Sequence, residues 1–241
     1  MIVFITPIIL FLICTFLIKK LIPFLKRMSL LDYPSHRSNH NILIPKGAGI
    51  ILIPLLIISV FGIFFFRGLL DNQWFIFLIS IIILYLISLI DDIKNLSALI
   101  RLLTHFFCVS ISIFILKEDI ALFIQNNIST WLHFNPLFLF YFLSVLLIFS
   151  WIWIINLFNF MDGMDGLTCI QVLTLFITTN ILCLFGFINE NFQLISLILI
   201  SLFLAFYKFN KPNASIFLGD VGSIPIGYIS GLLLITNFLK S

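Results

Sequence analysis

Charged residues are scarce in this sequence. Only 10% of its 241 residues are Asp, Glu, Lys or Arg, whereas 62% are hydrophobic. Soluble domains carry roughly 25% charged residues, so the composition excludes a soluble globular protein and indicates an integral membrane protein. The net charge of +3 is explained by basic loops between apolar segments and does not indicate a nucleic-acid partner.

Cysteine is also rare. Cys14, Cys108, Cys169 and Cys183 are scattered one to an apolar segment or its edge, which excludes a closely spaced metal or disulfide pair and favours apolar packing. The first apolar run lacks a basic leader and a small-residue cleavage site, so it is interpreted as a span rather than a signal peptide. No internal repeat or low-complexity linker divides the chain, and residues 1–241 are expected to form one domain.

Long apolar runs are abundant. Because a helix needs roughly 20 apolar residues to cross a bilayer, these runs predict an all-α integral membrane protein, a polytopic bundle of about eight transmembrane helices. The expected spans are Ile2 to Ile18, Gly49 to Phe66, Trp74 to Ile90, Leu102 to Leu116, Pro136 to Ile155, Leu167 to Phe187, Phe192 to Tyr207, and Ser223 to Phe238.

The basic residues predict an orientation. With Met1 outside, ten of the thirteen Lys and Arg residues fall on the inner side, and inner loops are the ones enriched in Lys and Arg. The inner set is Lys19, Lys20, Lys26, Arg27, Arg37, Lys46, Lys94, Arg101, Lys208 and Lys211, and the outer set is Arg67, Lys117 and Lys240. Every acidic cluster described below is then expected on the cytoplasmic face.

Half of the ten acidic residues gather at the ends of apolar runs. A charge at the bilayer centre costs roughly 2.5 kcal/mol or more, so such acids are predicted to be functional. Asp91 and Asp92 end one span, where two negative charges oppose the helix dipole unless a cation or basic partner compensates. The alternative is that the two acids form a pair at the membrane interface whose charges are satisfied and which has no function.

Two further clusters supply oxygen and amide groups. Asn156, Asn159, Asp162 and Asp165 recur every third residue, which on a helix or 3₁₀ turn lines one face. Asp220 stands at a predicted helix start, where the dipole and free amides also favour phosphate. Such hard donors suit Mg²⁺ or Mn²⁺, which take further ligands from substrate phosphates.

The first inner loop is the longest polar stretch. Its side chains, among them Arg37 and His40, are donors suited to phosphate oxygens, and Gly47 allows a ligand to approach the backbone closely. An ordinary basic membrane anchor is the alternative.

Taken in order, these motifs resemble the polyprenyl-phosphate N-acetylhexosamine-1-phosphate transferases. The resemblance runs from Asp32 to Gly227, and its first loop is similar to the branch that starts O-antigen and related surface polymers. The matching segments are Asp32-x-Pro34 with Arg37-Ser38-x-His40 and Pro45-Lys46-Gly47; Asp91-Asp92 with Leu96-Ser97 and Arg101; Asn156-x-x-Asn159-x-x-Asp162-Gly163-x-Asp165-Gly166; and Ile216-Phe217-Leu218-Gly219-Asp220-Val221-Gly222-Ser223.

The resemblance implies transfer of a sugar 1-phosphate from a UDP-N-acetylhexosamine to undecaprenyl phosphate in the bacterial inner membrane, with release of UMP and with Mg²⁺ as cofactor. It implies that Asp91 and Asp92 deprotonate or orient the lipid phosphate and that Asp220 binds the metal. By the same resemblance, phosphate and nucleoside are held by Asn156, Asn159, Asp162 and Asp165, with Asn210 and Phe217 near the uracil.

The sequence departs from the family pattern at its end. Family members continue past the Gly-Asp-x-Gly-Ser segment with two more spans and a His-rich cytoplasmic loop, whereas this sequence ends at Ser241. Arg37 and His40 are therefore predicted to carry part of that loop's duty in binding the nucleotide sugar. A catalytically silent or partner-dependent homologue and a cation or anionic-lipid transporter are the alternatives, and a homodimer is left open.

Overall fold

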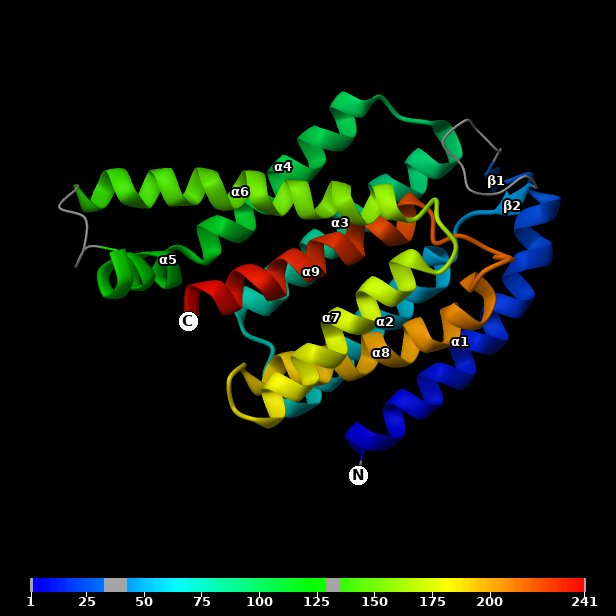
Figure 1. Ribbon diagram of the computed structural model, residues 1–241, viewed down its shortest axis with the longest axis horizontal. Helices are drawn as coiled ribbons and strands as arrows, with labels where there is room; N and C mark the ends of the chain where they lie inside the picture. Colours follow the sequence, from blue (N-terminus) through cyan, green and yellow to red (C-terminus); the bar gives the residue numbers. More distant parts are fainter. Residues whose placement is uncertain (1, 33–42, 129–134, 241) are drawn as a thin grey trace.

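Helices form nearly all of the structure, a computed structural model that describes residues 2–32, 43–128 and 135–240 (Figure 1). The elements are α1 (Ile2–Arg27), β1 (Leu31–Asp32), β2 (Ile44–Pro45), α2 (Gly49–Arg67), α3 (Asn72–Lys94), α4 (Ala98–Ile115), α5 (Lys117–Phe123), the π-helix η1 (Ile124–Ile128), α6 (Pro136–Met161), α7 (Leu167–Leu184), α8 (Glu190–Asn210) and α9 (Asp220–Lys240). Eight of these helices are long and apolar enough to cross a membrane, which confirms the predicted class.

Several helices extend beyond the apolar runs that predicted them, whereas α7 ends at Leu184 rather than Phe187. α1 continues to Arg27 rather than Ile18, and α6 continues to Met161 rather than Ile155. Long basic side chains explain the first difference, because their apolar stems lie along the helix while the charge reaches the interface. Lys20, for example, holds its ammonium 4.4 Å from the centre of the Phe16 ring.

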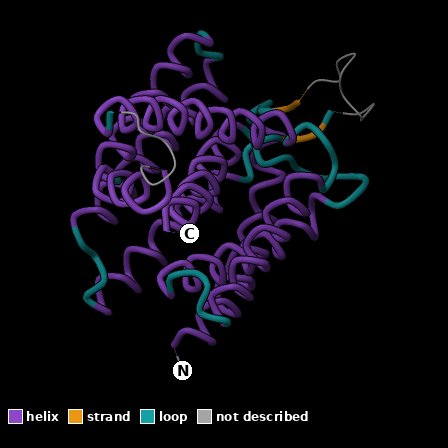
Figure 2. The backbone as a smooth tube through the Cα atoms, turned by 60° about the vertical axis from the view of Figure 1, so that its left-hand side comes forward, coloured by secondary structure: helices purple, strands orange, loops and turns teal. Residues whose placement is uncertain are grey.

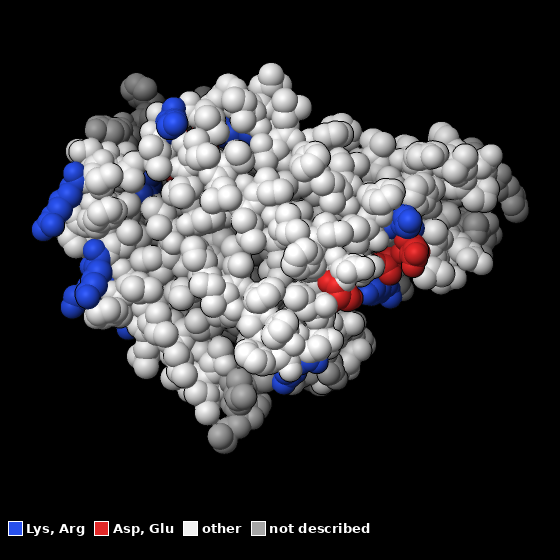
Figure 3. All heavy atoms as spheres, turned by 180° about the vertical axis from the view of Figure 1, so that it is seen from behind, with Lys and Arg blue, Asp and Glu red and all other residues white. Residues whose placement is uncertain are grey.

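Charged side chains are distributed over the surface as expected for a membrane protein. On the face drawn in Figure 3, charged side chains gather toward two opposite ends, and a broad belt between them is almost free of charge. In Figure 1 the connections from α3 to α4, from α6 to α7 and from α8 to α9 lie at one end of the bundle, with the strand pair beside them. This end is called the inner end below.

A small strand pair closes the first inner loop, which the sequence did not predict. Leu31 pairs with Pro45 and Asp32 with Ile44 in antiparallel register, at the edge of the inner end (Figure 2). The backbone then reaches across to the connection between α8 and α9, since Phe217 N donates to Pro45 O at 2.9 Å. The pair thereby fixes the following residue, Lys46, beside that connection.

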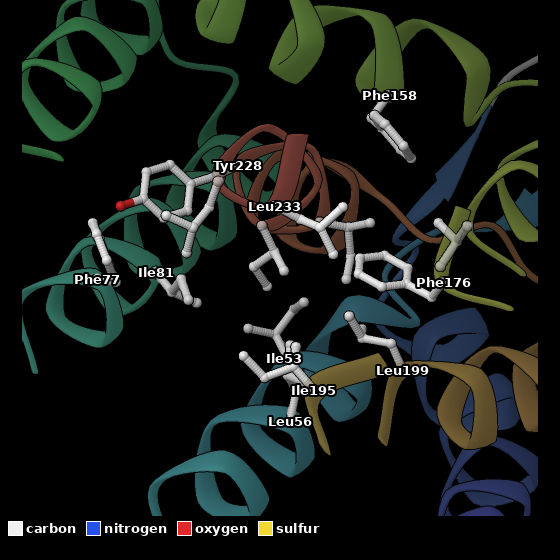
Figure 4. Packing of buried hydrophobic residues seen from close by; sticks show 14 of the residues in the cluster. Ile53, Leu56, Phe77, Ile81, Phe158, Phe176, Ile195, Leu199, Tyr228 and Leu233 are labelled. Carbon is white, nitrogen blue, oxygen red and sulfur yellow. The ribbon is translucent and has the colours of Figure 1, made fainter. Parts of the chain in front are cut away.

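The core is organised around α9, which packs on α6, α3 and α2. Figure 4 shows Tyr228 and Leu233 of this helix facing apolar side chains from several other helices. Trp151 of α6 stacks on Tyr228 with ring centroids 5.0 Å apart and donates a 2.9 Å hydrogen bond to the Tyr228 carbonyl. Gly231 lies one turn after Tyr228, and its lack of a side chain leaves space for the Trp151 ring.

Replacing Gly231 by Ala should destabilise the bundle. The added Cβ would overlap Trp151 Cδ1, so the ring must move away from its stack and its hydrogen bond. Overpacking of this kind costs about 1–3 kcal/mol, which a thermal unfolding experiment in detergent will detect. Gly62→Ala is the matched control, since a Cβ there meets nothing within 4 Å. Equal melting temperatures for Gly231→Ala and the wild type would contradict this packing account.

Candidate active site

Two of the acidic clusters meet at a single guanidinium group. Arg101, in the first turns of α4, places Nη1 3.2 Å from Asp91 Oδ2 and 3.2 Å from Asp220 Oδ2. Asp91 comes from the last turns of α3, and Asp220 is the first residue of α9. Residues 119 positions apart in the chain, Arg101 and Asp220, are therefore in direct contact.

Asp91 is almost fully buried, with 5% of its surface exposed. Its Oδ1 accepts a 2.7 Å hydrogen bond from Leu96 N, so the carboxylate orders the connection between α3 and α4. That connection leads directly to the Ser97 cap of α4 and so to Arg101. Asp91 therefore positions the start of α4 and also binds Arg101, which α4 carries.

Asp92 points to different partners, as adjacent residues of a helix do. Its Oδ2 accepts a 2.9 Å hydrogen bond from Val221 N in the first turn of α9, and its Oδ1 lies 3.2 Å from Lys46 Nζ. Burial lowers the pKa of Lys46, but attraction to Asp92, and more weakly to Asp220, outweighs this and leaves the pKa raised. Lys46 is therefore a cation at neutral pH. Asp91 and Asp92 therefore have different partners in the structure.

Asp220 is the most accessible of the three acids, with 25% of its side chain exposed. Asn159 of α6 donates to its Oδ1 at 2.8 Å and to Ser223 Oγ at 3.2 Å. Its place at the start of α9 lets the helix dipole stabilise its negative charge. Both oxygens of Asp220 thus have partners, Asn159 and Arg101, while a quarter of its side chain stays accessible to a ligand.

A hollow of about 250 Å³ lies between α4 and α6, next to the acidic centre formed by Asp91, Asp92 and Asp220. It is lined by Ala98, Arg101, Leu102, His105, Asn156, Asn159 and Ile224. A second hollow, of about 530 Å³, follows α6 and shares both asparagines, with Trp153, Leu157 and Phe160 as its apolar lining. Asn156 and Asn159 therefore border a polar space on one side and an apolar space on the other.

The polar helix face predicted for Asn156, Asn159, Asp162 and Asp165 is only half formed. α6 ends at Met161, so Asn156 and Asn159 are helical, whereas Asp162 and Asp165 lie in the connection to α7. Both acids turn toward the backbone between α8 and α9 instead of the hollow. Burial raises the pKa of Asp162 to about 7, while hydrogen bonds from Gly219 and Leu218 N act in the opposite direction.

Two other predicted residues support the same connection. Asn210 is 1% exposed, accepts a 3.1 Å hydrogen bond from Gly166 N and donates a 3.0 Å bond to Ile216 O. Phe217 is 2% exposed and packs with Ile44 and Ala214. Their contact with a uracil stays a prediction. Arg37 and His40 lie outside the described residues.

Comparison with known proteins identifies the family. The model of "Glycosyl transferase family 4" matches residues 74–237. The chain belongs to glycosyl transferase family 4. The match includes Asp91, Asp92, Arg101 and Asp220, so the acidic centre lies within the region shared with the family.

Curated relatives match shorter stretches. A phospho-N-acetylmuramoyl-pentapeptide-transferase of Wolbachia pipientis wMel is 38% identical over 77 residues, which is 32% of this chain and 24% of the relative. Proteins of the same name are 35% identical over 83 residues in Leuconostoc mesenteroides, covering 33% and 26%, and 34% identical over 97 residues in Streptococcus pyogenes serotype M49, covering 38% and 26%. The aligned region spans about a quarter of the length of these relatives.

Sequence reasoning overlooked three residues of this candidate site. Lys46, Arg101 and Ser223 all stood in the motifs quoted above, yet none was predicted to be a site residue. Each of them contacts an acid, or the amide that holds an acid, in the structure. The signal for Lys46 and Arg101 was available, because buried or half-buried carboxylates near a membrane require cationic partners.

The donor set fits a hard divalent cation only in part. Within the described residues, no group of three or more His, Cys, Asp or Glu side chains could hold a metal ion. Mg²⁺, however, is usually bound through one or two carboxylates together with substrate phosphates and water. Asp220 fits that mode, because it is the most exposed of the three acids and is linked to Asp91 through one guanidinium nitrogen.

Proposed function

We propose that this family member transfers a sugar 1-phosphate from a UDP-N-acetylhexosamine to a polyprenyl phosphate and releases UMP. The observation that carries the proposal is the convergence of Asp91, Asp92 and Asp220 on Arg101 and Lys46 at the inner end of a membrane bundle. A reaction between two anionic substrates requires that their negative charge be neutralised and that their phosphates be held in line. Acids and cations gathered at the membrane surface suit this requirement.

The residues divide the reaction between them. An oxygen of the lipid phosphate forms a bond to the sugar-linked phosphorus of the donor, and the bond from that phosphorus to the bridging oxygen breaks, so that UMP leaves. Asp91 and Asp92 orient the lipid phosphate or accept its proton, and Arg101 and Lys46 stabilise the negative charge. Asp220 would hold Mg²⁺ or Mn²⁺, whose chemistry when bound is to neutralise the diphosphate.

The two hollows provide separate approaches. Trp153 and Phe160, 72% and 73% exposed, present an apolar surface beside Asn156 and Asn159. A polyprenyl chain lying on this surface would bring its phosphate to the polar hollow from the bilayer, while the nucleotide sugar arrives from the aqueous inner side. Because the site acids lie at one end of the bundle, the structure favours this reaction over transport along a path through the membrane.

The donor sugar is the finer part of the proposal. The first-loop motif supports a UDP-N-acetylhexosamine used to start an O-antigen or a related surface polymer. The names of the relatives described above support a second candidate, the UDP-linked N-acetylmuramoyl-pentapeptide. Purified protein with polyprenyl phosphate and Mg²⁺ should release UMP from a UDP-N-acetylhexosamine. Turnover with the pentapeptide donor alone would favour the second candidate, and release from no donor would favour a silent or partner-dependent homologue.

The proposed function requires the inner end to face the cytoplasm of a bacterial inner membrane. Lys211→Cys lies at that end and Asn189→Cys at the other, and the four native cysteines are all buried. In intact cells, an impermeant thiol reagent applied from outside should therefore label Asn189→Cys and not Lys211→Cys. The reverse pattern would place the site away from cytosolic nucleotide sugars and contradict the proposal.

A further inference from the structure

The connection from α8 to α9, which leads into Asp220, is held by the carboxylate of Asp162 from the connection between α6 and α7. Asp162 Oδ1 accepts a 3.0 Å hydrogen bond from Leu218 N, and Asp162 Oδ2 accepts a 2.7 Å bond from Gly219 N. Asp162 is only 9% exposed, and both of its oxygens accept hydrogen bonds from the backbone. Their two donors are the residues that immediately precede Asp220.

The backbone at this point needs such a support. Gly219 has a φ of +78°, a left-handed conformation that allows the chain to turn sharply into α9. Beyond the turn, Asp92 accepts a hydrogen bond from Val221 N. The backbone is therefore held by one carboxylate just before Asp220 and by another just after it.

We propose that Asp162 is a positioning residue for Asp220 and does not itself contact the nucleotide. This inference rests on the proposed function, in which Asp220 holds the divalent cation. To reach a ligand, Asp162 would have to release Leu218 N and Gly219 N and leave two buried donors unpaired, which is unfavourable. A carboxylate that keeps both bonds fixes the direction in which Asp220 leaves the turn.

Asp165 is the matched control within the same motif. It also accepts two backbone hydrogen bonds, from Asn213 N at 2.9 Å and Ala214 N at 3.2 Å. These donors lie six or more positions before Asp220, and Asn213 is exposed. Loss of the Asp165 carboxylate should therefore leave the turn at Gly219 in place.

Binding of Mn²⁺ to the full-length protein without nucleotide tests the proposal. In Asp162→Asn, an amide N–H₂ replaces one acceptor and faces a backbone donor. Loss of a residue that orients a metal ligand typically lowers metal affinity by about 10–100-fold, so we expect a fall of about tenfold or more, measured by electron paramagnetic resonance. Asp165→Asn should bind Mn²⁺ like the wild type. Melting temperatures of both variants will show that the bundle remains folded.

The opposite pattern would overturn the inference. If Asp162→Asn binds Mn²⁺ as tightly as the wild type but loses affinity for the UDP-sugar, then Asp162 contacts the nucleotide. A wild type that fails to bind Mn²⁺ would instead count against the metal role of Asp220 in the proposed function.

Hydrogen exchange in the wild type provides a test that needs neither a metal nor a folded variant. The amides of Leu218 and Gly219 should be protected and should remain so when the UDP-sugar binds. Faster exchange of these amides on nucleotide binding would show that Asp162 releases them for the ligand and would refute a positioning role.

Discussion

Replacing Asp220 by Asn should nearly abolish UMP release while the bundle stays folded. Asp220 offers a partly exposed carboxylate bound to Arg101, at a helix start that stabilises negative charge. Removing one preorganised electrostatic contact typically lowers kcat by about 10²–10³-fold, and we expect a loss of at least this size. The measurement is the rate of UMP release at saturating Mg²⁺ and substrates.

Asp71→Asn is the control for this substitution. Asp71 caps α3 at the other end of the bundle, where its Oδ1 accepts a 2.9 Å hydrogen bond from Trp74 N. Asn caps helices about as well as Asp does, so this variant should retain both stability and turnover. Turnover of Asp220→Asn within a few-fold of the wild type would remove Asp220 from the proposed metal site.

Replacing Asp92 by Asn should lower kcat much more than it weakens binding of the UDP-sugar. Proton transfer by a positioned side chain contributes about 10²–10⁴-fold, and an interaction made mainly in the transition state appears chiefly in kcat. Steady-state rates together with direct binding of the UDP-sugar will separate the two effects. A loss of UDP-sugar affinity as large as the loss of kcat would contradict the assignment of Asp92 to the lipid phosphate.

The Lys46 ion pair complicates this experiment and also supplies its control. Asp92→Asn leaves the Lys46 cation, 27% exposed, without its carboxylate. Removing both charges, in Lys46→Met with Asp92→Asn, should recover stability lost through an unpaired cation. It should not recover kcat, because both charged groups act on the substrates. Recovery of turnover in the double variant would mean that Asp92 serves only to neutralise Lys46.

The fold was predictable because its main signal is local. Each span is an apolar run of sufficient length, and such runs can be recognised without knowing what packs against them. The helix ends were less predictable, since Lys20 can stay in α1 with its stem along Phe16. The strand pair escaped prediction because its two-residue strands depend on backbone contacts with the distant Phe217.

The gathering of the acids at one end of the bundle was more predictable than the contacts that each acid makes. Asp91, Asp92 and Asp220 stand out as acids in an apolar chain, and their common face follows from the alternation of spans. The partners of Asp162 could not be read from the sequence, because its donors lie 56 and 57 positions away. The same holds for Arg101, whose double contact depends on how α3, α4 and α9 pack.

The mass of the lipid product tests the central claim most directly. Purified protein is incubated with polyprenyl phosphate, Mg²⁺ and each of the two candidate UDP-linked donors, and the lipid and nucleotide products are identified by mass spectrometry. Transfer of a sugar 1-phosphate predicts a lipid heavier by one phosphosugar, with a diphosphate link, together with UMP. A lipid that has gained the sugar without the second phosphate, together with UDP, would contradict the account.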